Sequence, residues 1–202
     1  TTHFHDRHSA PAAPPTPGTV PAAPPYNEAE RLRLLADYRT LDAGTEQAFD
    51  DLATLAAAVC RAPMAFITLV DQHSQVFKAR QGLQADDMPR DMSFCAHAIL
   101  TPDALMEVPD ATQDGRFATN PLVTGPPGIR FYAGAPLVTP SGVALGTICI
   151  VDHQPRRLTL DERRALKSLA RQAVAQMELR QAVADLEMQG HTDGLTGIGN
   201  RR

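Results

Sequence analysis

The sequence predicts an α+β domain in which helices and loops enclose a β-sheet. Three observations support this. Two stretches with helical spacing of apolar residues come first, several short runs then alternate in the period of a strand, and a helical pattern without Pro or Gly closes the chain from Asp161 to Gln189. A length of 202 residues, a formal net charge of −4 and 43% hydrophobic content are typical of one such domain with extra segments at its ends.

Residues 1–27 form the first segment of the predicted organisation. They contain two Pro/Ala-rich runs, Ala10–Gly18 and Pro21–Pro25, and no periodic apolar pattern. Such a segment lacks the apolar side chains needed to offset the entropy lost on ordering. We therefore expect a disordered or semi-extended N-terminal segment.

Two helices and a pair of strands follow. A helix begins at Glu28, and a second one, capped by Thr45 after Gly44, runs to Val59 before Pro63 ends it. The run 64–71 alternates as a strand and is apolar on both faces, which indicates a central position in a sheet, and residues 75–80 form a more polar partner.

The second half of the chain repeats this mixture. We expect a short helix capped by Asp91 or Ser93, a short strand at 105–108 and a helical turn over 116–122 that ends near Pro121. Two longer strands, 129–139 and 144–151, are joined by the turn residues 140–142.

The closing helix begins with a capping box formed by Thr159 and Glu162. Its apolar face is wide enough as far as Met177 to cover a sheet, and then narrows to a coiled-coil-like stripe. We expect this helix to pair with its copy in a homodimer through Leu179, Val183 and Leu186.

Composition excludes several function classes. The weakly acidic charge gives no global attraction to nucleic acid or anionic lipid, and no apolar run is long enough to span a membrane or form a signal peptide, so we expect a cytoplasmic protein. Cys60, Cys95 and Cys149 are odd in number and far apart, which predicts free thiols and neither a disulfide framework nor a metal site. No cofactor is evident.

Residues 46–180 resemble the GAF family. The runs that carry the resemblance are Ile67–Asp71, Pro89–Ile99, Val108–Thr112, Arg116–Val123, Ile129–Leu137 and Leu145–Asp152. The resemblance implies a central antiparallel sheet of five or six strands. Helices would pack on one face, and loops with a short helix would close over a small-molecule cavity on the other. Residues 28–180 would then form a sensory GAF domain.

The run Asp193–Arg202, which is DGLTGIGNRR, resembles the opening of a GGDEF domain, with Ile198 where Leu is usual. Most members of that family are diguanylate cyclases, which make cyclic di-GMP from two GTP. The GGDEF signature itself does not follow, so residues 181–202 would be a signalling helix and the truncated start of that domain. The resemblance thus implies a chain without catalytic activity of its own, which regulates a diguanylate cyclase.

GAF domains bind very different ligands, and the sequence names none. A cyclic-nucleotide pattern is incomplete, because Leu158 replaces the usual Phe and no Asn-Lys element precedes it, and Cys95 does not stand in the context of a bilin attachment site. An unknown small molecule remains, bound at a few polar groups on the loop face. The pocket candidates are Ser93, Cys95, His97, Asp110, Thr112, Arg130 and Tyr132.

Two of these candidates have other interpretations. Arg130 could instead pair with Asp110 or Asp114 to fasten a loop, and Cys95 could be a small buried hydrophobe. Two rival functions also stay open. One is an enzyme of the GAF-type free methionine sulfoxide reductase kind with Cys95 as nucleophile, and the other is a ligand-free dimerisation module.

Overall fold

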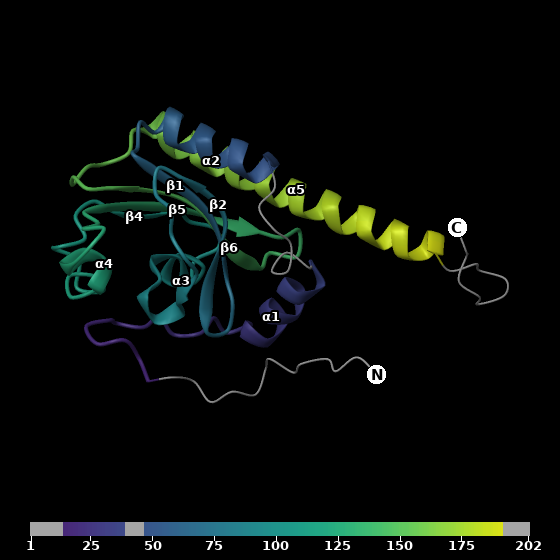
Figure 1. The fold of residues 1–202 in the computed structure, drawn as a ribbon, viewed down its shortest axis with the longest axis horizontal. Helices are drawn as coiled ribbons and strands as arrows, with labels where there is room; N and C mark the ends of the chain where they lie inside the picture. The colour runs from purple at the N-terminus through teal and green to yellow at the C-terminus, as the bar shows by residue number, and fades with distance from the viewer. Residues whose placement is uncertain (1–13, 39–46, 192–202) are drawn as a thin grey trace.

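Three central strands carry buried side chains on both of their faces. β1 (Met64–Val70) is buried at every position, and β5 (Phe131–Val138) and β6 (Ala144–Asp152) are buried at all but their last residue. In the computed structural model, which describes residues 14–38 and 47–191, they lie within a six-stranded antiparallel sheet of order β3-β2-β1-β6-β5-β4 (Figure 1). The remaining strands are β2 (Ser74–Gln81), β3 (Met88–Pro89) and β4 (Met106–Val108).

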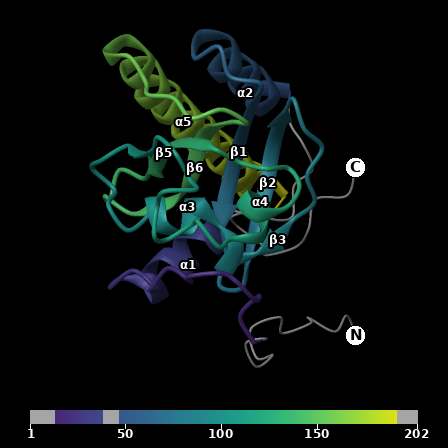
Figure 2. The ribbon, with the colours of Figure 1, turned by 90° about the vertical axis from the view of Figure 1, so that its left-hand side faces the viewer.

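Helices cover one face of this sheet. α2 (Gln47–Val59) and α5 (Leu160–His191) lie side by side across it, as the two views in Figures 1 and 2 agree. Ala53 and Ala56 of α2 and Ala170 and Ala173 of α5 are at most 4% exposed, and such small side chains let the helices approach the sheet closely. This face holds the larger hydrophobic cluster of the domain.

The long helix begins as expected and then leaves the sheet. The Thr159 amide donates to Glu162 Oε2 at 2.7 Å and the Glu162 amide donates to Thr159 Oγ1 at 3.2 Å, which is the predicted capping box. The buried face ends at Met177, and the last turns of α5 project past the sheet (Figure 1). None of the helices in residues 14–38 and 47–191 has the length and apolar character needed to cross a membrane.

The other face is covered by short helices and connecting segments. These are η1 (Arg90–Met92), α3 (Phe94–Ala98) and α4 (Pro121–Thr124). The expected helical turn is present from Asp114 to Asn120 and ends just before Pro121, but α4, which was not expected, begins at that proline. Asn120 caps α4 by accepting from the Leu122 amide at 2.9 Å, and Pro suits the first position, where no amide hydrogen is needed.

The part of the N-terminal segment that the structure describes, residues 14–27, lies against this loop face (Figure 1). Thr16 and Thr19 donate hydrogen bonds to the Asp91 carboxylate, and Ala22 packs against the hydrophobic cluster beneath. Their Pro/Ala composition did not indicate these contacts. Residues 1–13 lie outside the described part, as does Thr45, the expected cap of α2.

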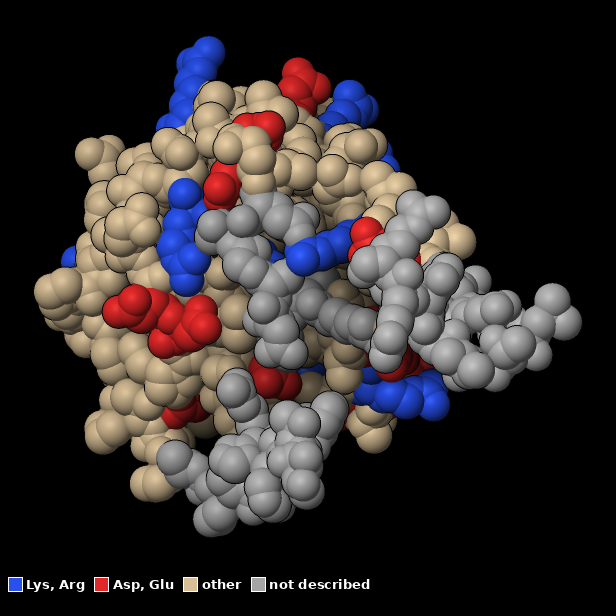
Figure 3. All heavy atoms as spheres, turned by 45° about the vertical axis from the view of Figure 1, so that its right-hand side comes forward, with Lys and Arg blue, Asp and Glu red and all other residues tan. Residues whose placement is uncertain are grey.

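Charges of both signs are interspersed on the face shown in Figure 3. That mixture agrees with the weakly acidic balance of the sequence, since no block of one sign dominates the visible surface of the described residues.

An ion-pair cluster anchors α1 (Glu28–Asp37) to the end of β1. Arg31 is 1% exposed, donates to the Val70 carbonyl, and holds Glu28 through two hydrogen bonds of 2.7 and 2.9 Å. Arg90 donates to the same carboxylate. Burial raises the pKa of Glu28, but its hydrogen bonds with Arg31 and Arg90 and the charges of both arginines outweigh this and lower it below 4.5.

This cluster predicts a pH-dependent contribution to stability. Because the folded-state pKa of Glu28 is depressed, its stabilisation is fully present above about pH 4.5 and is lost as the pH falls through the folded value. Glu28→Gln should therefore lower the free energy of unfolding by roughly 1–3 kcal/mol at pH 7 and by much less at low pH. Urea denaturation at a series of pH values measures the difference.

Asp161→Asn is the matched control, since its pair with Arg164 joins two exposed side chains and should contribute little. A Glu28→Gln difference that is independent of pH would contradict the assignment.

Candidate functional site

Aromatic side chains fill the centre of the loop face. The rings of Phe94 and Phe117 stack with centroids 3.9 Å apart at an interplanar angle of 10°, and the Tyr132 ring lies 5.2 Å from that of Phe94. All three side chains are at most 3% exposed. The space in which a small-molecule cavity was expected is packed by the protein's own side chains in this arrangement.

A cluster of sulfur and hydroxyl groups lies beneath these rings. Thr147 Oγ1 donates to Cys95 Sγ at 3.1 Å, Tyr132 Oη donates to the same sulfur at 3.4 Å, and Thr68 Oγ1 lies 3.4 Å from Thr147 Oγ1. Cys149 stands two residues after Thr147 on β6, so both point to the same face, where Cys149 lies close enough to Cys95 for each to shift the pKa of the other. All five side chains are at most 2% exposed, and we call these five residues the thiol–hydroxyl cluster.

The pKa values of the two thiols in this cluster are shifted in opposite directions. Burial raises the pKa of Cys95, but hydrogen bonds from Cys149, Thr147, Thr68 and Tyr132 lower it to about 6. The pKa of Cys149 is raised well above its usual value, first by its hydrogen bond with Cys95, then by burial and by the charge on Cys95. The donors around Cys95 thus direct any negative charge of the pair to that sulfur.

Gly134 makes room for Tyr132 in this cluster. A Cβ atom at position 134 would lie 2.2 Å from Tyr132 Oη and 2.7 Å from its Cζ, so the ring lies directly over the glycine. Gly134 pairs with Cys149 across the β5–β6 ladder. The absent side chain therefore places the Tyr132 hydroxyl beside both thiols.

Ser93 fixes the position of α3 above the sheet. Its Oγ accepts from the Ala96 amide at 2.9 Å, so Ser93 rather than Asp91 is the cap, and it donates to Oε1 of the buried Gln75 on β2. This pair of contacts ties the helix that carries Cys95 to the sheet that carries Cys149.

The other pocket candidates lie elsewhere. His97 turns away from the sheet, with its Nε2 3.0 Å from the Val20 carbonyl oxygen, and burial lowers its pKa. Asp110 accepts from the Thr112 amide at 3.0 Å and from its hydroxyl at 2.7 Å, in an exposed turn. Among the described residues, neither the His97 nor the Asp110 side chain hydrogen-bonds with the Arg130 guanidinium.

Arg130 fastens a loop, but not through an acid. Its Nη1 donates to the Val123 carbonyl at 2.9 Å and to its neighbour Ile129 at 3.1 Å. The expected alternative of a pair with Asp110 or Asp114 was wrong, because Asp114 instead binds Arg116 through contacts of 2.6 and 2.9 Å.

Sequence reasoning missed four residues that lie at this site, which are Gln75, Thr68, Thr147 and Cys149. Thr147 and Cys149 are two positions apart on β6, so strand alternation places them on one face. Polar side chains that face inward from a central strand are the pattern that could have identified the cluster.

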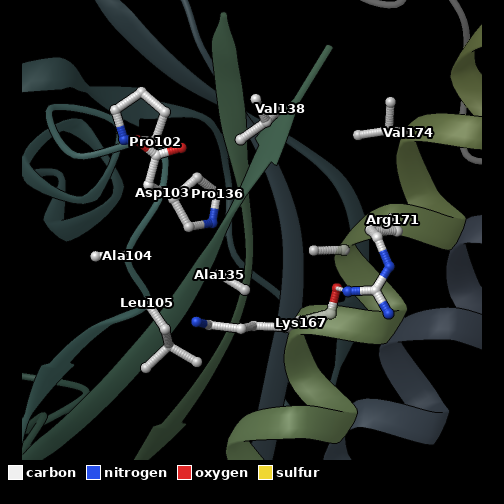
Figure 4. Close-up of a pocket in the computed structure, with 11 residues that line it drawn as sticks. Pro102, Asp103, Ala104, Leu105, Ala135, Pro136, Val138, Lys167, Arg171 and Val174 are labelled. Atoms are coloured by element: carbon white, nitrogen blue, oxygen red, sulfur yellow. Dashed lines mark hydrogen bonds between the residues drawn. The ribbon is translucent and has the colours of Figure 1, made fainter. Parts of the chain in front are cut away.

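The hollows among the described residues include two on the helix side. One, of about 160 Å³, is lined by the 102–105 loop, by Ala135, Pro136 and Val138 of β5, and by α5, with Lys167 and Arg171 at its edge (Figure 4). The other, of about 290 Å³, lies between the end of α2 and the start of α5. Both are smaller than typical ligand sites of roughly 300–1,000 Å³.

The contact between Tyr132 and Gly134 gives a direct test of the site's packing. Gly134→Ala should destabilise the fold by about 1–3 kcal/mol, because the buried ring has no free space to move into. Gly115→Ala is the control, since nothing lies within 4 Å of the place that the new Cβ atom would take. Thermal unfolding compares the two, and equal losses of stability would contradict the placement of Tyr132.

Comparison with known proteins agrees with this architecture. The family model for the GAF domain matches residues 44–177. The chain is also 38% identical over 183 residues to the cyclic di-GMP phosphodiesterase PA2567 of Pseudomonas aeruginosa, a match that covers 89% of this chain. The chain spans only 30% of the length of that relative.

Solved structures show the same fold at low identity. A GAF domain from a phosphoenolpyruvate-protein phosphotransferase of Coxiella burnetii superposes with a TM-score of 0.59 at 17% identity, over 79% of this chain and 97% of that one. A domain of a putative two-component sensor histidine kinase from Sinorhizobium meliloti gives 0.57 at 19% identity, over 70% and 97%. The six-stranded sheet, its helical layer and the matched residues together establish that this chain belongs to the GAF domain family.

Proposed function

We propose that this chain is the regulatory domain of an enzyme that makes or degrades cyclic di-GMP. The observation that carries the proposal is the agreement of two independent features. Residues 193–202, which lie outside the described part of the structure, resemble the start of a GGDEF domain, and the curated relative is named a cyclic di-GMP phosphodiesterase. Both concern the same nucleotide.

Synthesis and hydrolysis of cyclic di-GMP each have one observation in their favour. The terminal DGLTGIGNRR run favours a diguanylate cyclase, as the sequence led us to expect, while the relative's name favours hydrolysis. In either case this chain regulates and the chemistry takes place in another domain.

The geometry of α5 supports a role as the output element. The helix starts at a capping box and packs on β5 and β6 as far along its length as Met177. It then continues without a break to His191, just before the GGDEF-like run. An event on the loop face that favours one arrangement of β6 would act on α5 through seven connecting residues, 153–159.

The outer part of α5 supports a homodimer. Leu179, Val183 and Leu186 are 60, 46 and 67% exposed, and their spacing of four and three places them on one stripe. A second copy of the helix is the occupant that matches such a stripe. If the output domain is a cyclase, pairing would also bring together two sites, each with one GTP.

The packed loop face supports the rival function of a ligand-free dimerisation module and does not support that of a methionine sulfoxide reductase. A ligand-free dimerisation module needs no cavity, which fits the filled space around Phe94, Phe117 and Tyr132. An enzyme that acts on free methionine sulfoxide would need space for an amino acid beside Cys95, and that residue is 2% exposed under packed rings.

Dimerisation gives the first test. Leu179→Glu, Val183→Glu and Leu186→Glu should each weaken self-association by at least about tenfold, because a carboxylate would be buried at the seam. Gln181→Glu introduces the same charge on the opposite side of the helix and should have little effect. Sedimentation equilibrium measures the dissociation constants, and a wild-type chain that is monomeric at high concentration would contradict the proposal.

Activity gives the second test. The complete natural protein that contains this chain should convert GTP to cyclic di-GMP or hydrolyse cyclic di-GMP. A single charge on the stripe, introduced as Val183→Glu, should change that rate without altering the fold of the GAF domain. Chromatography of the nucleotides measures both reactions, and failure to act on either nucleotide would overturn the assignment.

A further inference from the structure

Two cysteines that are 54 positions apart in sequence meet on the loop face. Cys95 comes from α3 and Cys149 from β6, and each is 2% exposed. The two sulfur groups are close enough for each to shift the pKa of the other, and Thr147 Oγ1 lies 3.1 Å from Cys95 Sγ. Two neighbouring free thiols are the reactants of a disulfide, so their surroundings decide whether they react.

Cys60 provides an internal comparison. It is 0% exposed and lies in the hydrophobic cluster on the helix face, on the opposite side of the sheet. Burial raises its pKa to about 11, with a further increase from Glu162 that Arg156 partly offsets. Cys60 and Cys95 are thus similarly buried, but only Cys95 accepts hydrogen bonds from two hydroxyl groups.

We propose that Cys95 and Cys149 form a redox couple in which Cys95 is the thiol that attacks a hydroperoxide and Cys149 is the thiol that resolves the product as a disulfide. Thr147 and Tyr132 position the attacking sulfur through their hydroxyl groups. As a means of regulation this rests on the proposed sensory function, whereas the thiol chemistry itself does not.

The reaction balances in two steps. The Cys95 thiolate attacks the outer peroxide oxygen, the O–O bond breaks, and a sulfenic acid forms while the alcohol or water leaves with the proton that Cys95 released. Cys149 sulfur then attacks the sulfenic sulfur, the S–S bond forms, and hydroxide leaves with the Cys149 proton as water. Two thiols are oxidised by two electrons, and one hydroperoxide is reduced.

The surrounding hydroxyl groups suit the first step. Thr147 and Tyr132 donate to Cys95, and Thr68 lies next to Thr147 in position to donate to it in turn. Hydrogen bonds from this chain of donors stabilise a thiolate. The lowered pKa of Cys95, about 6, agrees with that arrangement.

Burial of the two sulfur atoms limits how fast a hydroperoxide can reach them. Since the sulfur atoms lie under the aromatic layer, a hydroperoxide reaches them only when the loop-side segments move, and oxidation should be slower than that of an exposed thiol. The disulfide would tie α3 to β6, the strand that leads into α5. Oxidation would therefore act on the element that we propose as the output.

The test counts thiols after exposure to hydrogen peroxide. The folded chain is incubated at pH 7.5, denatured, alkylated and weighed by mass spectrometry. We expect two of the three thiols to be lost together, a peptide containing the Cys95–Cys149 link, and full recovery with dithiothreitol. Cys60 should remain reduced throughout.

Variants separate the roles. Cys149→Ser should leave a Cys95 sulfenic acid that reacts with dimedone and no internal disulfide, and Cys95→Ser should leave Cys149 reduced. Cys60→Ser should behave as the unmodified chain. Thr147→Val retains the shape of the side chain without its hydroxyl and should slow the oxidation of Cys95 about tenfold. Circular dichroism spectra establish that each variant is folded.

Three outcomes would overturn the proposal. They are oxidation of Cys60 at the same rate as Cys95, loss of Cys95 without a link to Cys149, and no loss of thiols under conditions that oxidise glutathione. None of them bears on whether the complete protein acts on cyclic di-GMP, so failure of this chemistry is distinct from failure of the proposed function.

Discussion

The fold depends on one constraint, which is that strands β1, β6 and β5 are apolar on both faces. A sheet of this kind must be covered twice, because either open face would leave contiguous apolar surface in water. α2 and α5 cover one face with small alanine contacts, and α3, α4 and their loops cover the other with aromatic rings. The central strands therefore separate a helical layer from a loop layer, and each layer contacts the same strands.

That constraint is also what made the architecture predictable. Alternation identified residues 64–71 as a central strand and residues 144–151 as a strand, and the pair Thr159 and Glu162 identified the start of α5, because these patterns depend on local geometry alone. The start of α4 at Pro121 was missed, since a proline that follows one helical turn can also begin the next, and the Asn120 cap identifies that second role. Contacts of Thr16 and Thr19 with Asp91 join segments more than 70 positions apart, which no local pattern encodes.

The site was predictable to the extent that strand register fixes it. Tyr132 and Cys95 meet because a short side chain on α3 and a ring over Gly134 have little freedom once the sheet is formed. Arg130 is two positions before Tyr132 in the chain, but its long side chain reaches back to the backbone carbonyl of Val123 in the preceding loop. Strand alternation predicts the face of the sheet from which a side chain leaves the backbone. For a long polar residue it does not predict the position of the charged group at the end of the side chain.

The arrangement of α5 explains how a change on the loop face could reach another domain. The helix has a docked part that ends at Met177 and an outer part in which Leu179, Val183 and Leu186 are exposed, so the two parts present their apolar side chains to different surroundings. Sheet packing holds the first, and we propose that a second copy holds the other. An event that shifts β6 changes only the first set of contacts, and because α5 is continuous, the dimer seam must accommodate the resulting rotation or displacement. The rigidity of an uninterrupted helix is thus what would convert a small change beside Cys149 into a different relative placement of two output domains.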